Sequence, residues 1–188
     1  VIANNLICSD APSINLNASI GNAINGSWRT LGSGTFTPDT IFSNTTAYVH
    51  STADVTNGEV KLILFSSGTG SCPQISDTLT ITITKTPTAT ALADQTLCSD
   101  VTSISLSGTY TNADTARWLT NGAGTFSPDS LALPGVQYNP DPADITATQI
   151  EIYLETVTAN LCAPAIDTVT ITFTPTPTIS GLNDFDIC

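Results

Sequence analysis

Hydrophobic and polar residues alternate along much of this chain. The clearest run is Thr-Leu-Thr-Ile-Thr-Ile-Thr at 78–84, in which threonine would face water and leucine or isoleucine would face a core. This alternation predicts half-buried β-strands, and no segment shows a convincing helical period. In the first half of the chain the predicted strands cover residues 13–19, 26–30, 34–37, 47–51, 59–66 and 77–84.

Glycine-containing segments separate these predicted strands and favour turns. They read Gly-Ser-Gly at 32–34, Thr-Asn-Gly at 56–58 and Ser-Gly-Thr-Gly at 67–70, and each can supply the positive φ that a tight turn needs. Short strands with frequent turns are typical of a β-sandwich. The sequence therefore predicts an all-β protein of the immunoglobulin-like class.

The five cysteines reveal an internal repeat. Cys8, Cys98 and Cys188 are spaced by 90 residues, and so are Cys72 and Cys162. The same shift, made without a gap, superposes further pairs, among them Trp28 and Trp118, Tyr48 and Tyr138, and Asp54 and Asp144. We therefore expect tandem β-sandwich domains arranged end to end.

Proline-containing segments mark the expected joints between repeats. Thr-Pro-Thr occupies 86–88 and Pro-Thr-Pro-Thr occupies 175–178, where proline removes backbone donors and favours extended chain. We expect an immunoglobulin-like repeat at 1–86 that lacks part of its first strand, a complete repeat at 87–176, and the start of a third repeat at 177–188. Further copies of the repeat are expected in the parent chain.

The charge balance argues against nucleic acid and anionic membranes as partners. The chain has 16 acidic and 4 basic residues, so it offers no cationic surface for phosphates. No apolar run is long enough to cross a bilayer, and the first residues lack the pattern of a signal peptide. We expect no direct membrane insertion of this segment.

The cysteine spacing favours disulfides over metal binding. The nearest cysteines are 26 residues apart, whereas a thiolate metal site needs two within a few residues. We expect structural disulfides, with free buried thiols as the alternative. The default pairing joins Cys8 to Cys72 and Cys98 to Cys162, and leaves Cys188 for a partner elsewhere. A competing pairing joins Cys8 to Cys162, because in an end-to-end array the turn before the second strand of one repeat would meet the final hairpin tip of the next.

Few side chains offer catalytic chemistry. A nucleophile needs a base and an orienting group, and the only histidine, His50, aligns with Pro140 in the second repeat. Trp28 and Trp118 fall on short strands, where we expect them to anchor the cores and not to stack on sugars. The sequence predicts that the chain is not an enzyme.

The acidic pairs leave two alternatives open for metal binding. Asp141 with Asp144, and Asp184 with Asp186, lack both a D-x-D-x-D-G calcium loop and a glycosidase motif. We expect no cofactor. The open alternatives for these carboxylates are a calcium ion at a domain joint and solvated loop residues.

A short pattern recurs in which Asp precedes Thr or Ser and then an apolar residue. The simplest interpretation is that Asp-Thr opens a strand. The hydroxyl residues of this pattern are Thr40, Thr78, Thr115, Ser130 and Thr168.

Four segments carry a resemblance to a known family: Gly-Thr-Phe-Thr-Pro at 34–38, Ser-Cys-Pro at 71–73, residues 77–84, and Asp-Gln-Thr-Leu-Cys at 94–98. The chain resembles the immunoglobulin-like or PKD-like tandem repeats of giant Bacteroidetes surface proteins, including gliding-motility adhesins. It departs from the PKD pattern Trp-x-Phe-Gly-Asp-Gly, since Trp28 is followed by Arg and Thr.

The resemblance implies type IX secretion, long cell-surface filaments and adhesion to surfaces or neighbouring cells. It also implies O-glycans on the five hydroxyl residues named above. We therefore expect an extracellular stalk whose partners are further repeats, surface glycans, neighbouring filaments or cells. The alternative is a carbohydrate- or protein-binding accessory module of a secreted multidomain hydrolase.

Overall fold

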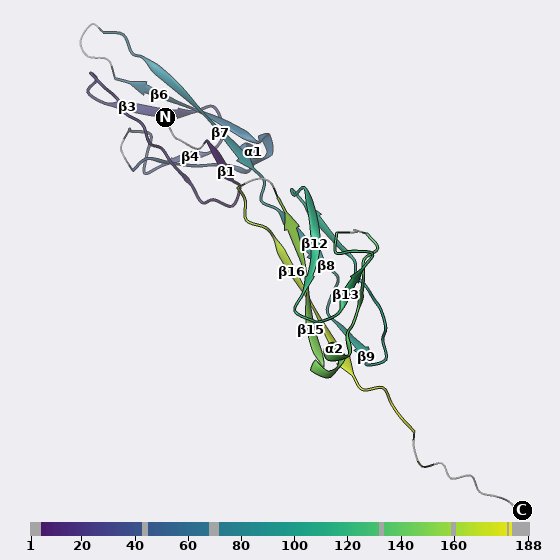
Figure 1. Cartoon of the computed structure of the whole chain (residues 1–188). Helices are drawn as coiled ribbons and strands as arrows, with labels where there is room; N and C mark the ends of the chain where they lie inside the picture. Colours follow the sequence, from purple (N-terminus) through teal and green to yellow (C-terminus); the bar gives the residue numbers. More distant parts are fainter. Residues whose placement is uncertain are drawn as a thin grey trace, which may run out of the picture. The chain divides into compact units, whose positions relative to one another are not determined.

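The computed structural model describes residues 5–42, 45–67, 72–131, 134–158, 161–179 and 181. The chain divides into two compact units (Figure 1). The first unit comprises Val1–Pro87 with Thr158–Ala163, and the second comprises Thr88–Val157 with Pro164–Cys188. Each unit is a β-sandwich, which confirms the predicted immunoglobulin-like class.

The first unit contains seven of the strands. A four-stranded sheet has the order β1-β7-β6-β3, in which β1 runs parallel to β7, and a three-stranded sheet has the order β2-β5-β4. The strands are β1 (Leu6–Cys8), β2 (Ile14–Asn15), β3 (Gly26–Thr30), β4 (Thr35–Thr37), β5 (Ala47–Val49), β6 (Glu59–Ser66) and β7 (Ser76–Thr84).

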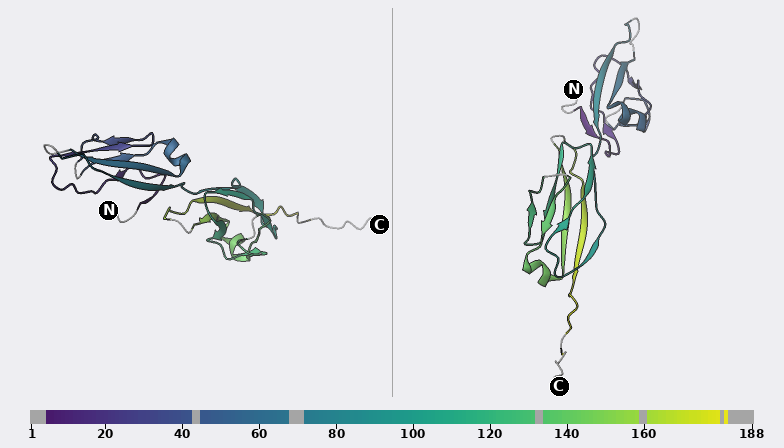
Figure 2. Two further views of the ribbon diagram at one scale, coloured as in Figure 1. Left: turned by 90° about the horizontal axis from the view of Figure 1, so that it is seen from above. Right: turned by 90° about the vertical axis from the view of Figure 1, so that its right-hand side faces the viewer.

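The second unit repeats this topology and adds a two-stranded pair. Its sheets have the orders β9-β16-β15-β12 and β10-β14-β13, and β8 pairs with β11. Figure 2 shows the ribbon of this unit, coloured teal to yellow-green, from two further sides. The strands are β8 (Thr88–Ala91), β9 (Gln95–Cys98), β10 (Ile104–Ser105), β11 (Gly108–Thr111), β12 (Thr115–Thr120), β13 (Thr125–Ser127), β14 (Gln137–Asn139), β15 (Gln149–Val157) and β16 (Ile166–Thr174).

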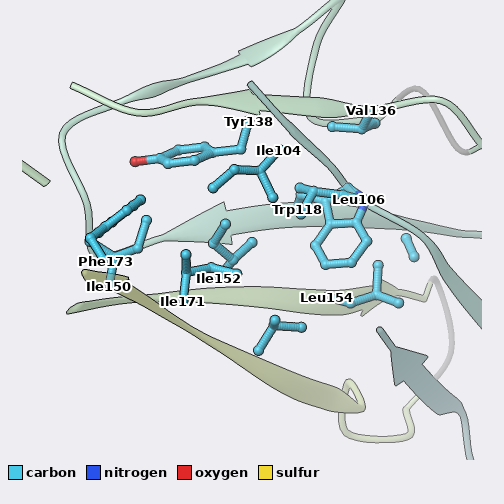
Figure 3. Packing of buried hydrophobic residues seen from close by; sticks show 12 residues of the cluster. Ile104, Leu106, Trp118, Val136, Tyr138, Ile150, Ile152, Leu154, Ile171 and Phe173 are labelled. Carbon is cyan, nitrogen blue, oxygen red and sulfur yellow. The ribbon is translucent and has the colours of Figure 1, made fainter. Parts of the chain in front are cut away.

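Alternating residues of facing sheets fill each core. In β7 the side chains of Ile81 and Ile83 are buried while Thr82 between them is exposed, as the period of two predicts. Figure 3 shows the second core, in which Trp118, Ile152 and other large side chains fill the space between the sheets. Burial of such side chains contributes about 2 kcal/mol each and holds the sheets together.

Each unit also contains one short helix, which the sequence did not predict. Helix α1 covers Thr52–Asn57 and α2 covers Pro142–Ala147. Six residues are too few for a helical period to be visible, and so short a helix depends on its caps. Ser51 and Asp141 are the N-caps, and each forms a capping box with the aspartate three residues later.

The predicted strand boundaries hold best for the long strands. Residues 26–30 and 59–66 form β3 and β6 as predicted. The expected strand at 13–19 is wrong in extent, because only Ile14–Asn15 pairs with β5. The expected strand at 47–51 stops at Val49, because Ser51 already caps α1.

The glycine turns are explained by two different constraints. Gly58 has the positive φ that was predicted for this turn, 75°, and it ends α1, which was not predicted. Gly34 has no positive φ, and the reason for glycine at this position is space, because a Cβ there would collide with the carbonyl oxygen of Val49. Most of the segment 67–70 lies outside the described residues.

Candidate functional site

A disulfide bond joins Cys8 to Cys162 across 154 residues of sequence. Cys8 ends β1, where it lies opposite Thr84 in the parallel register with β7. Ser9 continues this pairing by donating its backbone N–H to the Thr84 carbonyl at 2.8 Å. The Cα atoms of the two cysteines are 5.5 Å apart, within the usual range for a disulfide.

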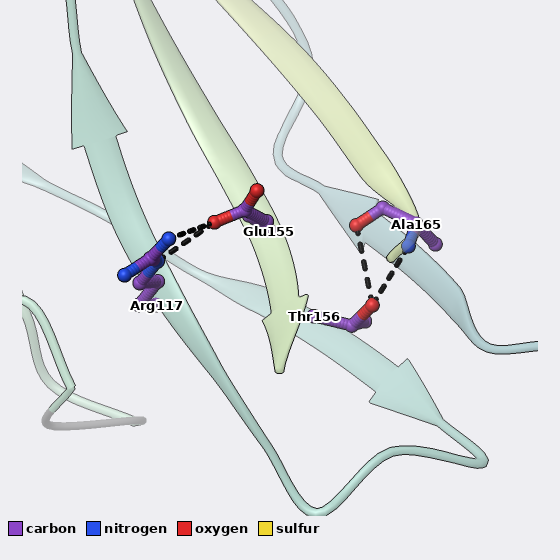
Figure 4. Close-up of polar contacts among 4 residues, drawn as sticks. All are labelled: Arg117, Glu155, Thr156 and Ala165. Atoms are coloured by element: carbon purple, nitrogen blue, oxygen red, sulfur yellow. Dashed lines mark hydrogen bonds and ion pairs between the residues drawn. The ribbon is translucent and has the colours of Figure 1, made fainter. Parts of the chain in front are cut away.

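Cys162 is positioned by the hairpin between β15 and β16. Thr156 at the end of β15 is 1% exposed, and its backbone N–H donates to the Ala165 carbonyl at 2.9 Å. The Ala165 N–H donates to the Thr156 hydroxyl at 2.7 Å, so the base of the loop is closed from both sides (Figure 4). Beside it, Arg117 pairs with Glu155 at 2.6 Å across β12 and β15.

The default disulfide pairing is wrong, and strand geometry explains why. Cys8 lies beside Thr84 at the end of β7, whereas Cys72 precedes Ser76 at its start. Nine strand residues at about 3.3 Å each separate these ends by more than 25 Å, while a disulfide requires Cα atoms within about 7 Å. The same argument separates Cys98 from Cys162 along β16.

The remaining described cysteines form no disulfide within this chain. Cys72 and Cys98 are exposed free thiols, so the prediction that they form disulfides is not met within this chain. Cys188 lies outside the described residues. Since the bond joins Cys8 in the first sequence repeat to Cys162 in the second, the competing pairing is the one that forms.

A second repeated feature is a buried aspartate that organises a loop, a helix and a tyrosine. In the first unit, Asp54 is 1% exposed and accepts the Tyr48 hydroxyl at 2.9 Å. It also accepts the backbone N–H groups of Ser33 and Gly34 at 3.1 Å each, and of Ser51 at 2.9 Å. One carboxylate therefore holds together the 32–34 turn, β5 and the start of α1; we call this set the tyrosine–aspartate brace.

The second unit contains the same brace around Asp144. The Tyr138 hydroxyl donates to Asp144 Oδ2 at 2.6 Å, and the backbone N–H groups of Ala123, Gly124 and Asp141 donate at 2.6, 3.1 and 3.0 Å. The Gly124 N–H also donates to the Tyr138 oxygen at 2.9 Å. These donors replace the water that a buried carboxylate loses.

The braces shift the pKa values of their members in opposite directions. Burial alone raises the pKa of Asp144, but the hydrogen bonds from Tyr138, Ala123 and Asp141 outweigh burial and leave the pKa below 3.8. Burial likewise raises the pKa of Asp54, but the hydrogen bonds from Ser51, Ser33 and Tyr48 outweigh burial and lower the pKa. Burial and the bond to Asp144 raise the pKa of Tyr138 to about 12. Both members therefore keep their ordinary charge states at neutral pH.

The braces were missed at the level of sequence, although a signal was present. Ser51-x-x-Asp54 and Asp141-x-x-Asp144 are capping-box patterns at the same position of each repeat. The pair Asp141 and Asp144, considered above for calcium, caps α2 and closes the brace. In the described ranges no three His, Cys, Asp or Glu side chains gather as metal ligands would. Asp184 and Asp186 fall outside those ranges.

The two tryptophans lie inside the cores. Trp28 is 5% and Trp118 is 0% exposed, so neither offers a face for stacking on a sugar. Phe36 stacks on Trp28 with ring centroids 6.4 Å apart. His50, which was expected at the surface, is half-buried, and its Nε2 lies 3.0 Å from the Ala11 carbonyl oxygen.

The hydroxyl residues of the Asp-Thr/Ser pattern differ in accessibility. Thr40, Thr78 and Thr168 are exposed, whereas Thr115 and Ser130 are half-buried. The aspartates before Thr40 and Ser130 accept the backbone N–H two residues later at 2.7 Å, so these pairs form Asx turns.

An open groove of about 410 Å³ in the first unit is lined by Trp28, Leu64 and Asp77 among others. The equivalent Asp167 in the second unit accepts the Ala91 N–H of β8 at 2.8 Å. Strand β8 lies against β15 and β16, so the corresponding side chains are covered there.

Neither helix in the described part of the chain has the length and apolar character that a membrane crossing requires.

No protein-family profile matches this sequence, and no curated protein matches it either. Among solved structures, the chain is similar to Drosophila N-cadherin EC1-4, with 16% identity, a TM-score of 0.47, and coverage of 90% of this chain and 47% of that one. It is also similar to human protocadherin-24 EC1-2, with 10% identity, a TM-score of 0.42 and coverage of 91% and 94%. A third is mouse cadherin-23 EC22-24, with 8% identity, a TM-score of 0.39 and coverage of 90% and 62%. The chain thus spans about half the length of the N-cadherin fragment.

Proposed function

We propose that this chain is a load-bearing stalk segment of a long extracellular adhesin or filament, and not an enzyme. The observation that carries the proposal is the Cys8–Cys162 bond between successive sequence repeats. Disulfides persist in oxidising surroundings, so the bond supports a location outside the cytoplasm. The 90-residue repeat supports a chain built by addition of copies.

The bond suits a chain under tension. A force applied to the two ends of the chain passes through the disulfide and bypasses the 154-residue loop that it closes. Both braces and most of both cores lie inside this loop. The segment would therefore keep its length under a load that unfolds an ordinary tandem array.

The finer proposal is a gliding-motility adhesin that leaves the cell by type IX secretion. Its support is the sequence resemblance together with the exposure of Thr40, Thr78 and Thr168, which could accept O-glycans. The alternative, a sugar-binding accessory module, has less support because both tryptophans are buried. In this proposal the partners are further repeats, neighbouring filaments or cells.

Surface labelling tests the function. Antibodies against this chain should bind intact cells of the source organism, and deletion of the parent gene should reduce attachment to surfaces. Labelling that appears only after permeabilisation would contradict an extracellular stalk. Attachment that is unchanged in the deletion strain would contradict a role in adhesion.

A further inference from the structure

Two exposed thiols occupy positions whose counterparts in the other repeat form the disulfide. Cys98 lies 90 residues after Cys8, and Cys72 lies 90 residues before Cys162. Both are exposed and free in this chain. The repeat therefore presents one strand-end thiol and one hairpin-tip thiol whose equivalents are bonded to each other.

The strand-end position is the same in both units. Cys98 ends β9 opposite Thr174 in a parallel register, as Cys8 ends β1 opposite Thr84. The Ser99 N–H donates to the Thr174 carbonyl at 2.8 Å, which matches the bond from Ser9. Cys98 is therefore held on the same backbone frame as the bonded Cys8.

The two hairpins that carry Cys72 and Cys162 also share the hydrogen bonds at the base of their loops. The Ser66 N–H donates to the Ile75 carbonyl at 2.9 Å, and the Ile75 N–H donates to the Ser66 hydroxyl at 3.1 Å. Thr156 and Ala165 make the same two bonds beneath Cys162. Cys72 thus follows the same loop base as the bonded Cys162.

We propose that Cys98 and Cys72 are the two halves of this same linkage, made with other copies of the repeat. Cys98 binds the hairpin-tip cysteine of another copy, and Cys72 binds the strand-end cysteine of another copy. Neither can find its partner in its own unit, because a nine-residue strand separates the two positions. In solution, a second molecule of this chain supplies the partner, and the bond is Cys98 to Cys72.

The chemistry balances with a small disulfide as oxidant. One cysteine thiolate attacks oxidised glutathione and releases one glutathione thiol. The thiolate of the second cysteine then displaces the remaining glutathione, so two cysteine thiols become one disulfide and one glutathione disulfide becomes two thiols.

The linkage would join successive copies of the repeat by disulfide bonds. This inference rests on the proposed function as a stalk and adds how the copies are linked. Cys72 and Cys98 are separated by 26 residues. Tension entering at one cysteine would cross these residues and leave through the other. Most of each sandwich would then carry no load.

The test uses two single-thiol versions of the full chain, both with Cys188→Ser. One version also carries Cys72→Ser and keeps Cys98, and the other carries Cys98→Ser and keeps Cys72. One version is labelled with nitrogen-15, and equal amounts are mixed with oxidised glutathione. Mass spectrometry without reduction then measures the mixed dimer against the two like-with-like dimers.

Random pairing of equally reactive thiols makes half of the dimers mixed. We expect the mixed Cys98–Cys72 dimer to exceed the like-with-like dimers several-fold, and the excess to vanish when urea unfolds the chains. A random ratio in native buffer would overturn the proposal. So would a bond between Cys72 and Cys98 within one molecule of the Cys188→Ser chain. This ratio does not depend on where the parent protein is located, so its failure is distinguishable from failure of the proposed function.

Discussion

Cys8 lies opposite Thr84 in the parallel β1–β7 pair, and this register places it at the far end of β7 from the hairpin that carries Cys72. Cys98 lies in the same way opposite Thr174, at the far end of β16 from the hairpin that carries Cys162. The disulfide that forms links Cys8 to Cys162 and so joins sequence repeats instead of bracing one of them.

The substitution Cys162→Ser should destabilise the first unit. It opens a loop of 154 residues, and in the chain-entropy view such a closure contributes up to about 5 kcal/mol. Urea unfolding of the oxidised protein measures the loss. The matched control is Cys72→Ser at the equivalent hairpin tip, where the thiol is exposed and free, and we expect a change within about 0.5 kcal/mol. Equal effects of the two substitutions would contradict the assigned pairing.

The substitution Tyr138→Phe should cost about 1 to 3 kcal/mol, because it leaves buried Asp144 without one of its donors. Thermal or urea unfolding reports the change. Tyr110→Phe is the control, since the Tyr110 hydroxyl has no hydrogen bond within the described ranges. If the two variants lose equal stability, the Tyr138 hydroxyl does not brace the fold.

Acid should weaken both braces. The pKa values of Asp54 and Asp144 are lower in the folded chain than the ordinary 3.8, so the unfolded chain takes up protons first as pH falls. The stabilisation is complete above about pH 5 and is lost as pH falls through the lowered values. Unfolding free energies at pH 7 and pH 3 should differ less in Asp144→Asn than in the natural chain. An unchanged pH dependence in that variant would argue against the brace at Asp144.

The sequence predicted the parts of the fold that follow from a period of two. Strands β3 and β6 and the cores around Trp28 and Trp118 follow from alternating residues. The helices could not be found in this way, because each has six residues, fewer than two turns, and depends on a cap. The braces depend on contacts between residues about 20 positions apart, such as Gly34 with Asp54, which no periodicity reveals.

The sequence also could not decide which cysteines pair. Spacing showed that Cys8, Cys72 and Cys162 belong to a repeat, but the choice between partners depends on which end of β7 faces each cysteine. Strand β1 has three residues and its parallel register with β7 was not predicted. Once that register is known, the distance along β7 excludes the pairing within one sandwich.

The turn before β13 should tolerate no side chain at Gly124. A Cβ there would lie 2.7 Å from the Tyr138 ring and closer still to the Asn139 carbonyl oxygen. Gly124→Ala should therefore lower the unfolding free energy by about 1 to 3 kcal/mol, through strain against the Tyr138 ring and the Asn139 carbonyl. Gly21→Ala is the matched control, since a Cβ at Gly21 meets nothing within 4 Å and its φ is not positive. Comparable unfolding free energies of the two variants would show that the turn has room for a Cβ at Gly124.

Pulling on the two ends of a single molecule tests the stalk most directly. With the Cys8–Cys162 bond intact, unfolding should extend only the residues outside the 154-residue loop. After reduction the same molecule should gain roughly 500 Å of further extension, at about 3.4 Å for each released residue. Full extension before reduction would mean that the bond does not carry the load, and would contradict the account of this chain as a covalently secured stalk.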